Sequence, residues 1–146
     1  MQAAPFDHGA MLSAARVRVT APARLHLGFL DLEGGLGRRF GSLGLAIEEV
    51  ATELTLRAAA ADRIAGPEAP RLAQHLATLR AAWGVAPAVA VTVGRAIPAH
   101  AGLGSGTQLG LALGLGLAAL VGREATAAEV AALLERGARS GIGVGA

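Results

Sequence analysis

The glycine-rich apolar segment at residues 97–122, IPAHAGLGSGTQLGLALGLGLAALVG, constrains the fold more than any other part of the chain. It begins with a proline-containing turn and continues into an almost purely apolar run. Two interpretations compete: a membrane span, or a phosphate loop that leads into a buried helix. The uninterrupted apolar run covers only residues 109–121, which is roughly 20 Å of helix, whereas a bilayer core needs about 20 residues. The length therefore favours a buried helix.

The glycines inside the predicted helix follow a regular spacing. Gly106, Gly110 and Gly114, followed by Ala118, recur every four residues and share one helix face. Membrane helices use the same spacing to approach one another, but a soluble helix can use it to lie close to a sheet or a second helix. Each glycine costs roughly 0.5 to 1 kcal/mol relative to alanine, so close packing is the physical reason that we expect for this stripe.

The residues just before the helix need another explanation. Gly102, Gly104 and Ser105 precede or begin it, and a glycine-rich loop at a helix N-terminus is a typical anion site. Ser105 and Thr107 would add hydroxyl donors. The alternative is an ordinary helix start in which Ser105 is the N-cap. The two remain open on spacing alone.

The composition excludes several classes of protein. All 13 basic residues are arginine, and without lysine the chain can form neither a Walker A loop nor a Schiff base, nor can it be a protein kinase. The arginines are scattered, so we expect no nucleic-acid partner, and we expect no membrane partner either. The chain lacks cysteine, which favours a cytoplasmic protein.

Hydrophobic periodicity predicts the order of the elements. Strands are expected at residues 16–20, which end before Pro22, at 24–30 as a second strand or a continuation, at 51–58 and at 89–93. Helices are expected at residues 69–83, 104–121 and 126–136, with Gly84 ending the first and Glu129 at a capping-box position in the last. Residues 1–15 are predicted to be a flexible tail, 33–44 a loop or hairpin tip, and 60–70 a linker. The order predicts an α+β fold with two layers, a mostly antiparallel sheet carrying helices on one face.

Three blocks of sequence carry a resemblance to a known family. The run PxxxGLGS, from Pro98 to Ser105, resembles the phosphate-binding motif of the GHMP kinase superfamily, although those kinases usually continue as GLGSSA and this chain reads GLGSGTQ. Together with APARLHLGFLDLEGGLGRRFGSLGLAI and RSGIGVGA, this variant resembles the beta-ribofuranosylaminobenzene 5'-phosphate synthase family. The resemblance covers residues 17–146. It implies that residues 16–146 form a GHMP-kinase-like N-terminal domain, truncated before a C-terminal domain.

The resemblance also implies a reaction. Phosphoribosyl pyrophosphate is joined to 4-aminobenzoate, or to 4-hydroxybenzoate, with release of pyrophosphate and carbon dioxide in methanopterin biosynthesis. Mg²⁺ is the expected cofactor, and a homodimer is the expected assembly. A GHMP small-molecule kinase that uses ATP, of the sugar, homoserine or mevalonate type, is the alternative in the same superfamily. A non-catalytic binding fragment is the third.

The same resemblance suggests site residues. The catalytic candidates are Arg24, His26 and His100. The candidates for binding phosphate and substrate are Gly102, Leu103, Gly104, Ser105, Gly106, Thr107, Gln108, Arg139 and Ser140. Asp31 is the candidate metal or ribose ligand. We assign His8 to the tail and His75 to a helix surface.

Each of these assignments has a structural alternative. Arg24 suits bidentate binding of a phosphate or carboxylate, and His26 suits a hydrogen bond to the substrate; the alternatives are a strand-surface arginine and a histidine satisfied within the fold. His100 and Gln108 distinguish the loop from that of the kinases and are candidates for choosing the substrate. Their alternatives are a loop hydrogen bond and a helix-surface amide.

Overall fold

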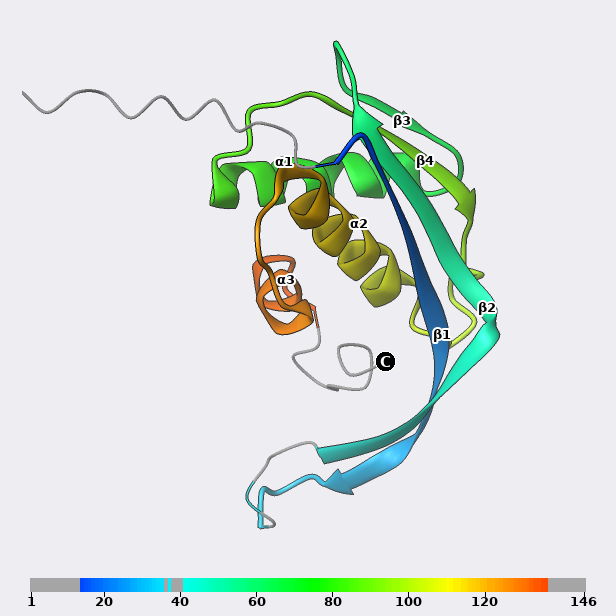
Figure 1. The fold of residues 1–146 in the computed structure, drawn as a ribbon. Helices are drawn as coiled ribbons and strands as arrows, with labels where there is room; N and C mark the ends of the chain where they lie inside the picture. The colour runs from blue at the N-terminus through cyan, green and yellow to red at the C-terminus, as the bar shows by residue number, and fades with distance from the viewer. Residues whose placement is uncertain (1–13, 36, 38–40, 137–146) are drawn as a thin grey trace, which may run out of the picture.

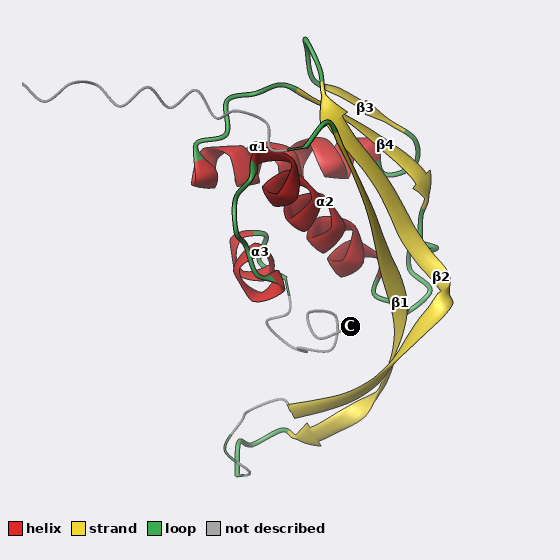
Figure 2. Ribbon diagram, viewed as in Figure 1, coloured by secondary structure: helices red, strands yellow, loops and turns green. Residues whose placement is uncertain are grey.

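The computed structural model describes residues 14–35, 37 and 41–136. Four strands form one sheet in the order β1-β2-β4-β3, with β1 at Arg16–Asp31, β2 at Gly41–Ala58, β3 at Arg63–Ala65 and β4 at Val89–Arg95. The β1–β2 and β2–β4 pairs are antiparallel and the short β3 runs parallel to β4. Helices α1 (Ala69–Trp83), α2 (Ser105–Val121) and α3 (Ala127–Leu133) cover one face of the sheet (Figure 2). The predicted α+β architecture is confirmed.

The first two predicted strands are one continuous strand. β1 runs through Pro22, and the register of its pairing with β2 shifts between Pro22 and Ala23. Because β1 is an edge strand, the missing N–H of proline is tolerated at this irregularity. β2 begins at Gly41, so the end of the predicted loop at 33–44 is already part of a strand.

A short strand lies where the sequence predicted only a linker. β3 occupies part of residues 60–70 and pairs with β4. Just before β3, the Asp62 carboxylate accepts hydrogen bonds from both terminal nitrogens of Arg80, at 2.6 and 2.9 Å, and from the backbone N–H of Val89, at 2.8 Å. These bonds join α1 and β4 to the segment that carries β3. The prediction of a linker failed because contacts distant in sequence stabilise this strand.

Helix α2 packs on β1 and β2 and contacts both α1 and α3 (Figure 1). A Cβ atom on Gly116 would lie 2.6 Å from Leu56 of β2, so this side of α2 packs directly on the sheet. On the other side, Cβ atoms on Gly110 and Gly114 would overlap Leu134 and Val130. The glycine stripe therefore gives the close packing that the spacing predicts. Among the described residues, no helix is long and apolar enough to cross a membrane.

The ends of the helices follow the predicted signals in part. Gly84 ends α1 in the left-handed conformation, at φ 65°. Thr126 accepts a hydrogen bond from the N–H of Glu129 at 3.1 Å and caps α3, which ends at Leu133 rather than near residue 136. The Glu129 carboxylate bonds to Arg123 at 2.9 Å and to Trp83 at 3.2 Å. Glu129 therefore has two roles: its backbone N–H takes part in the cap of α3, and its carboxylate joins α3 to α1.

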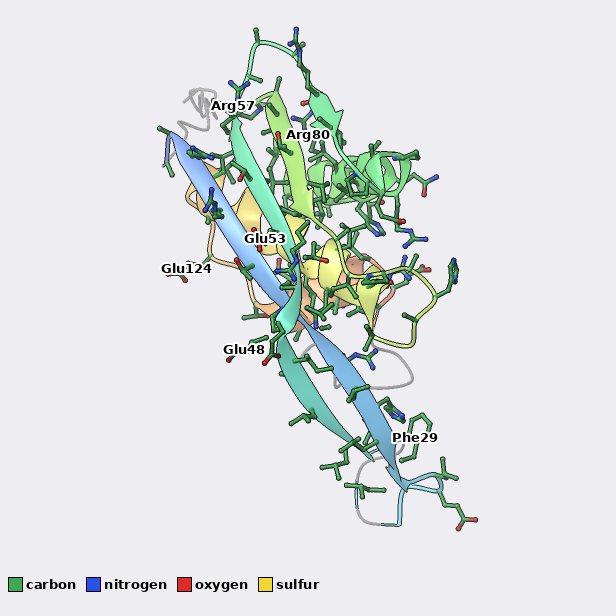
Figure 3. The ribbon with its side chains drawn as sticks, turned by 90° about the vertical axis from the view of Figure 1, so that its right-hand side faces the viewer. Phe29, Glu48, Glu53, Arg57, Arg80 and Glu124 are labelled. Carbon is green, nitrogen blue, oxygen red and sulfur yellow. The ribbon has the colours of Figure 1, made fainter. Side chains whose placement is uncertain are left out.

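The distal parts of β1 and β2 form a two-stranded arm that extends beyond the helices (Figure 1). Phe29 lies toward the outer end of this arm, while Arg57 lies at the opposite end of the sheet (Figure 3). Several large apolar side chains of the arm and its tip are exposed: Leu25, Leu27, Phe29, Leu30, Leu32, Leu43 and Leu45.

Candidate active site

The loop between β4 and α2 uses left-handed backbone at three positions. His100, Gly102 and Gly104 have φ values of 60°, 74° and 76°. Two of the three are glycine, which adopts this conformation without steric cost. Ile97 N–H donates to Thr52 Oγ1 at 3.3 Å, so β2 holds the start of the loop.

The first turn of α2 has amide groups that point toward the loop. Gly104 is the N-cap and makes no side-chain cap, so the alternative in which Ser105 is the N-cap is wrong. The N–H groups of Thr107 and Gln108 both donate to the Gly104 carbonyl at 3.1 Å. Helical geometry leaves the N–H groups of Ser105 and Gly106 for a ligand. Within the predicted range of 102–107, the Thr107 amide is thus used inside the helix, and the helix start carries the positive end of the helix dipole.

Arg24 of β1 lies directly against this loop. Its backbone N–H donates to the Leu103 carbonyl at 3.1 Å. A Cβ atom on Gly104 would lie 2.9 Å from Arg24 Nε, so the arginine occupies the space that a side chain at position 104 would need. Arg24 Nε is buried and has no hydrogen-bond partner within the described part of the chain. The fold thus brings together two sequence blocks about 80 residues apart, as the hypothesis of a shared site requires.

Two further arginines reach the same helix end from its other side. Arg71 Nη1 and Arg136 Nη1 lie 3.7 and 3.8 Å from the position of a Cβ on Gly106. Arg71 comes from the first turn of α1 and forms an ion pair with Glu68 at 2.9 Å, while Arg136 follows α3. Neither residue was predicted from the sequence. One signal was available, because a cation in the first turn of a helix opposes the helix dipole and calls for a compensating partner.

His75 of α1 lies beside these arginines. Only 7% of its surface is exposed, so its assignment to a helix surface is wrong. Its Nε2 lies 3.8 Å from the position of a Cβ on Gly110 and has no hydrogen-bond partner among the described residues. Burial lowers the pKa of His75 below its usual value of 6.5, and the charges of Arg136 and Arg71 lower the pKa further. The spacing Leu72, His75, Leu76, Leu79 places it on the buried face of α1, a signal that the sequence contained.

The low pKa of His75 makes stability depend on pH. At pH values above 6.5 the imidazole is neutral in both the folded and the unfolded chain, and the folded state has its full stability. Below that value the unfolded chain binds the proton first, so the free energy of unfolding falls as the pH falls. We expect urea unfolding between about pH 8 and about pH 5 to show a smaller pH dependence in His75→Gln than in the unaltered chain. A His100→Gln control at an exposed position should keep the full dependence; equal dependence in all three proteins would contradict the assignment.

The other predicted site residues differ in burial and in the groups that they contact. His26 is half-buried and lies on the same face of β1 as Arg24. The centroids of the His26 and Phe29 rings are 4.5 Å apart. His100 is exposed in the loop. Gln108 is only 2% exposed, so the alternative of a helix-surface amide is wrong.

The remaining predictions fall on residues of which less is described. Asp31 is the last residue of β1, and its side chain lies outside the described part. Arg139, Ser140 and most of the predicted tail, including His8, lie outside the described residues. Their roles stay predictions.

The donor set around the loop suits an anion. The described side chains that approach the loop include three arginines and a histidine whose pKa is lowered, which are poor ligands for Mg²⁺, while the Glu68 carboxylate is paired with Arg71. In the described ranges no group of three His, Cys, Asp or Glu residues is placed to hold a metal. The guanidinium groups and the helix amides instead match phosphate oxygens.

A four-stranded α+β domain with a glycine-rich loop at the N-terminus of a central buried helix has the architecture of a GHMP kinase N-terminal domain. The family described as the GHMP kinases N terminal domain matches residues 71–145, and the chain belongs to this family.

Solved structures share the fold. The 4-(cytidine 5'-diphospho)-2C-methyl-D-erythritol kinase aligns with a TM-score of 0.62 at 23% identity, over 80% of this chain and 46% of that one. The Streptococcus pneumoniae phosphomevalonate kinase aligns with a TM-score of 0.63 at 16% identity, over 90% and 44% of the two chains. At these identities the likeness shows the architecture alone.

Curated relatives are more similar in sequence. A protein of Archaeoglobus fulgidus named beta-ribofuranosylphenol 5'-phosphate synthase is 34% identical over 128 residues, covering 88% of this chain and 41% of the relative. A Methanocaldococcus jannaschii protein of the same name is 33% identical over 143 residues, covering 88% and 43%. The chain therefore spans about two fifths of the length of these relatives.

Proposed function

We propose that the intact protein transfers the phosphoribosyl group of phosphoribosyl pyrophosphate to a hydroxy- or aminobenzoate, with release of pyrophosphate and carbon dioxide, as a step of methanopterin biosynthesis. The observation that carries the proposal is the similarity to synthases over 88% of the chain. The arginines at the phosphate loop support it, because a departing diphosphate needs cationic and amide donors.

The acceptor in this proposal is 4-hydroxybenzoate. The relatives are named for a ribofuranosylphenol, and loss of carbon dioxide from a hydroxybenzoate leaves a phenol. 4-Aminobenzoate, the other acceptor that the sequence resemblance implies, would leave an aniline instead. The two substrates therefore give distinguishable products.

The proposed reaction gives roles to the amide groups at the start of α2 and to two side chains of β1. The bond between the anomeric carbon and the diphosphate oxygen breaks, and its electron pair leaves with pyrophosphate. The N–H groups of Ser105 and Gly106 and the guanidinium of Arg24 stabilise the charge that develops on the leaving group. The ring carbon that bears the carboxylate then forms the new carbon–carbon bond, and loss of carbon dioxide returns an electron pair to the ring. We assign a hydrogen bond to the acceptor to His26, because it shares a face of β1 with Arg24.

Three further features belong to the proposal. Mg²⁺ enters as a counter-ion carried by the diphosphate, since this ion commonly binds through substrate phosphates. The absence of cysteine supports a cytoplasmic location. The exposed apolar side chains of the β1–β2 arm support a homodimer.

The test supplies the intact protein with phosphoribosyl pyrophosphate and carboxyl-labelled 4-hydroxybenzoate or 4-aminobenzoate. We expect labelled carbon dioxide and pyrophosphate in equal amounts, and faster release with 4-hydroxybenzoate. ATP with homoserine, mevalonate and sugars serves as the comparison. Turnover of ATP without release of carbon dioxide would make the protein a kinase and overturn the proposal.

A further inference from the structure

The cationic groups at the start of α2 lie on two opposite sides of the helix. Arg24 approaches Gly104 from β1, on the side where α2 packs against the sheet. Arg71 of α1 and Arg136, which follows α3, approach Gly106. They lie on the side of α2 that packs against α3 through Gly110 and Gly114. The single arginine and the arginine pair therefore approach two different residues of the helix end, Gly104 and Gly106, from different elements of the fold.

Among the described residues, the two charges of the Arg71–Arg136 pair are met by one paired carboxylate. Both Nη1 atoms lie within 3.8 Å of the same point, the Cβ position of Gly106. Glu68 pairs with Arg71, while in the described ranges Arg136 makes no ion pair and its buried Nε has no hydrogen-bond partner. Two guanidinium groups held this close repel each other unless an anion lies between them.

His75 is a second, independent sign of a ligand on this side. Its side chain is more than nine-tenths buried, and its unpartnered Nε2 faces Gly110, one turn along α2 from Gly106 on the same face. Burial and the two arginines lower its pKa, so the imidazole adds no third positive charge at neutral pH. A neutral Nε2 can then donate or accept a hydrogen bond without repelling the arginines.

We propose that Arg71, Arg136 and His75 form a second phosphate subsite, separate from the one made by Arg24 and the loop amides. The whole site then takes a sugar that carries a diphosphate at one end and a single phosphate at the other. The assignment of the groups rests on the proposed function: the diphosphate of phosphoribosyl pyrophosphate lies at the loop and Arg24, and its 5-phosphate lies between Arg71 and Arg136. The contiguous phosphates of a nucleoside triphosphate would occupy the loop side alone.

The test measures binding of ribose 5-phosphate to the intact protein by calorimetry, with inorganic pyrophosphate saturating. Pyrophosphate fills the loop side, so that ribose 5-phosphate reports the second subsite. We expect the double variant Arg71→Gln with Arg136→Gln to bind ribose 5-phosphate at least about tenfold more weakly, and to bind pyrophosphate within about twofold of the unaltered protein. Arg57→Gln, at the far end of the sheet (Figure 3), is the matched control and should change neither affinity.

Three outcomes would overturn the subsite. In the first, the double variant loses affinity for ribose 5-phosphate and for pyrophosphate to the same extent. In the second, it loses affinity for neither ligand. In the third, the unaltered protein does not bind ribose 5-phosphate once pyrophosphate is bound. The single variants Arg71→Lys and Arg136→Lys check for misfolding, since they keep the charge and should retain part of the affinity. The synthase assay is read separately. If the unaltered protein makes no product but ribose 5-phosphate binding depends on the arginine pair, the proposed function fails and the subsite stands.

Discussion

Replacing Gly114 by valine is expected to lower the free energy of unfolding by about 3 kcal/mol. A Cβ at this position would overlap Cγ1 and Cγ2 of Val130 and lie tightly against its Cβ, so α3 would have to move away from α2. Because both helices are buried here, the displacement would also open the packing around Leu134. Urea unfolding followed by circular dichroism measures the change.

Ala119→Val is the matched control for this substitution. Ala119 is exposed on the same helix, so the β-branched side chain should cost only about 0.5 kcal/mol of helix propensity. A double-mutant cycle with Val130→Ala adds a second check, because removing the overlapping methyl groups should make the pair more stable than the sum of the single effects. Equal effects of valine at positions 114 and 119 would show that the two helices do not pack as closely as described.

Replacing Arg24 by glutamine is expected to reduce kcat/KM for phosphoribosyl pyrophosphate by about 100-fold, with a parallel loss of pyrophosphate affinity. The guanidinium is the cation closest to Gly104, and two charge-assisted hydrogen bonds to a phosphate account for a loss of this size. Steady-state kinetics of the intact protein with each substrate varied in turn measures the change.

A control variant separates the loss of the Arg24 contact with phosphate from a general disturbance of the fold. Arg57→Gln removes the same charge at the far end of the sheet and should leave the kinetics unchanged. Melting temperature should fall little in either variant, because Arg24 Nε makes no hydrogen bond to another described residue. Full activity in Arg24→Gln would exclude the arginine from the phosphate site, even if the loop itself binds the diphosphate.

Local patterns predicted the helices well. α1 spans Ala69–Trp83 as its apolar spacing indicates, and α2 begins within one residue of the predicted start. Capping at Thr126 and the left-handed Gly84 also followed from residue type and position. These features depend on contacts within a few residues, which is why a single sequence specifies them.

The strands and the deeper part of the site were predicted less well. The continuity of β1 through Pro22, the short β3 and the burial of His75 all depend on partners that are distant in the chain. Arg71 and Arg136 are separated by 65 residues, and nothing local relates them. Their convergence on Gly106 follows from the way α1 and α3 pack against α2.

The sequence by itself determined the α+β class and a glycine-rich loop that leads into a buried helix, because residue type and spacing are local properties. The candidate role of Arg24 came from the family resemblance. Only the tertiary structure decided that the loop has cations on two sides. Gly110 and Gly114 remove side-chain bulk from α2, so α3 lies close and the residues after it reach the helix end. That packing brings Arg71 and Arg136 to Gly106, next to the loop that Arg24 contacts.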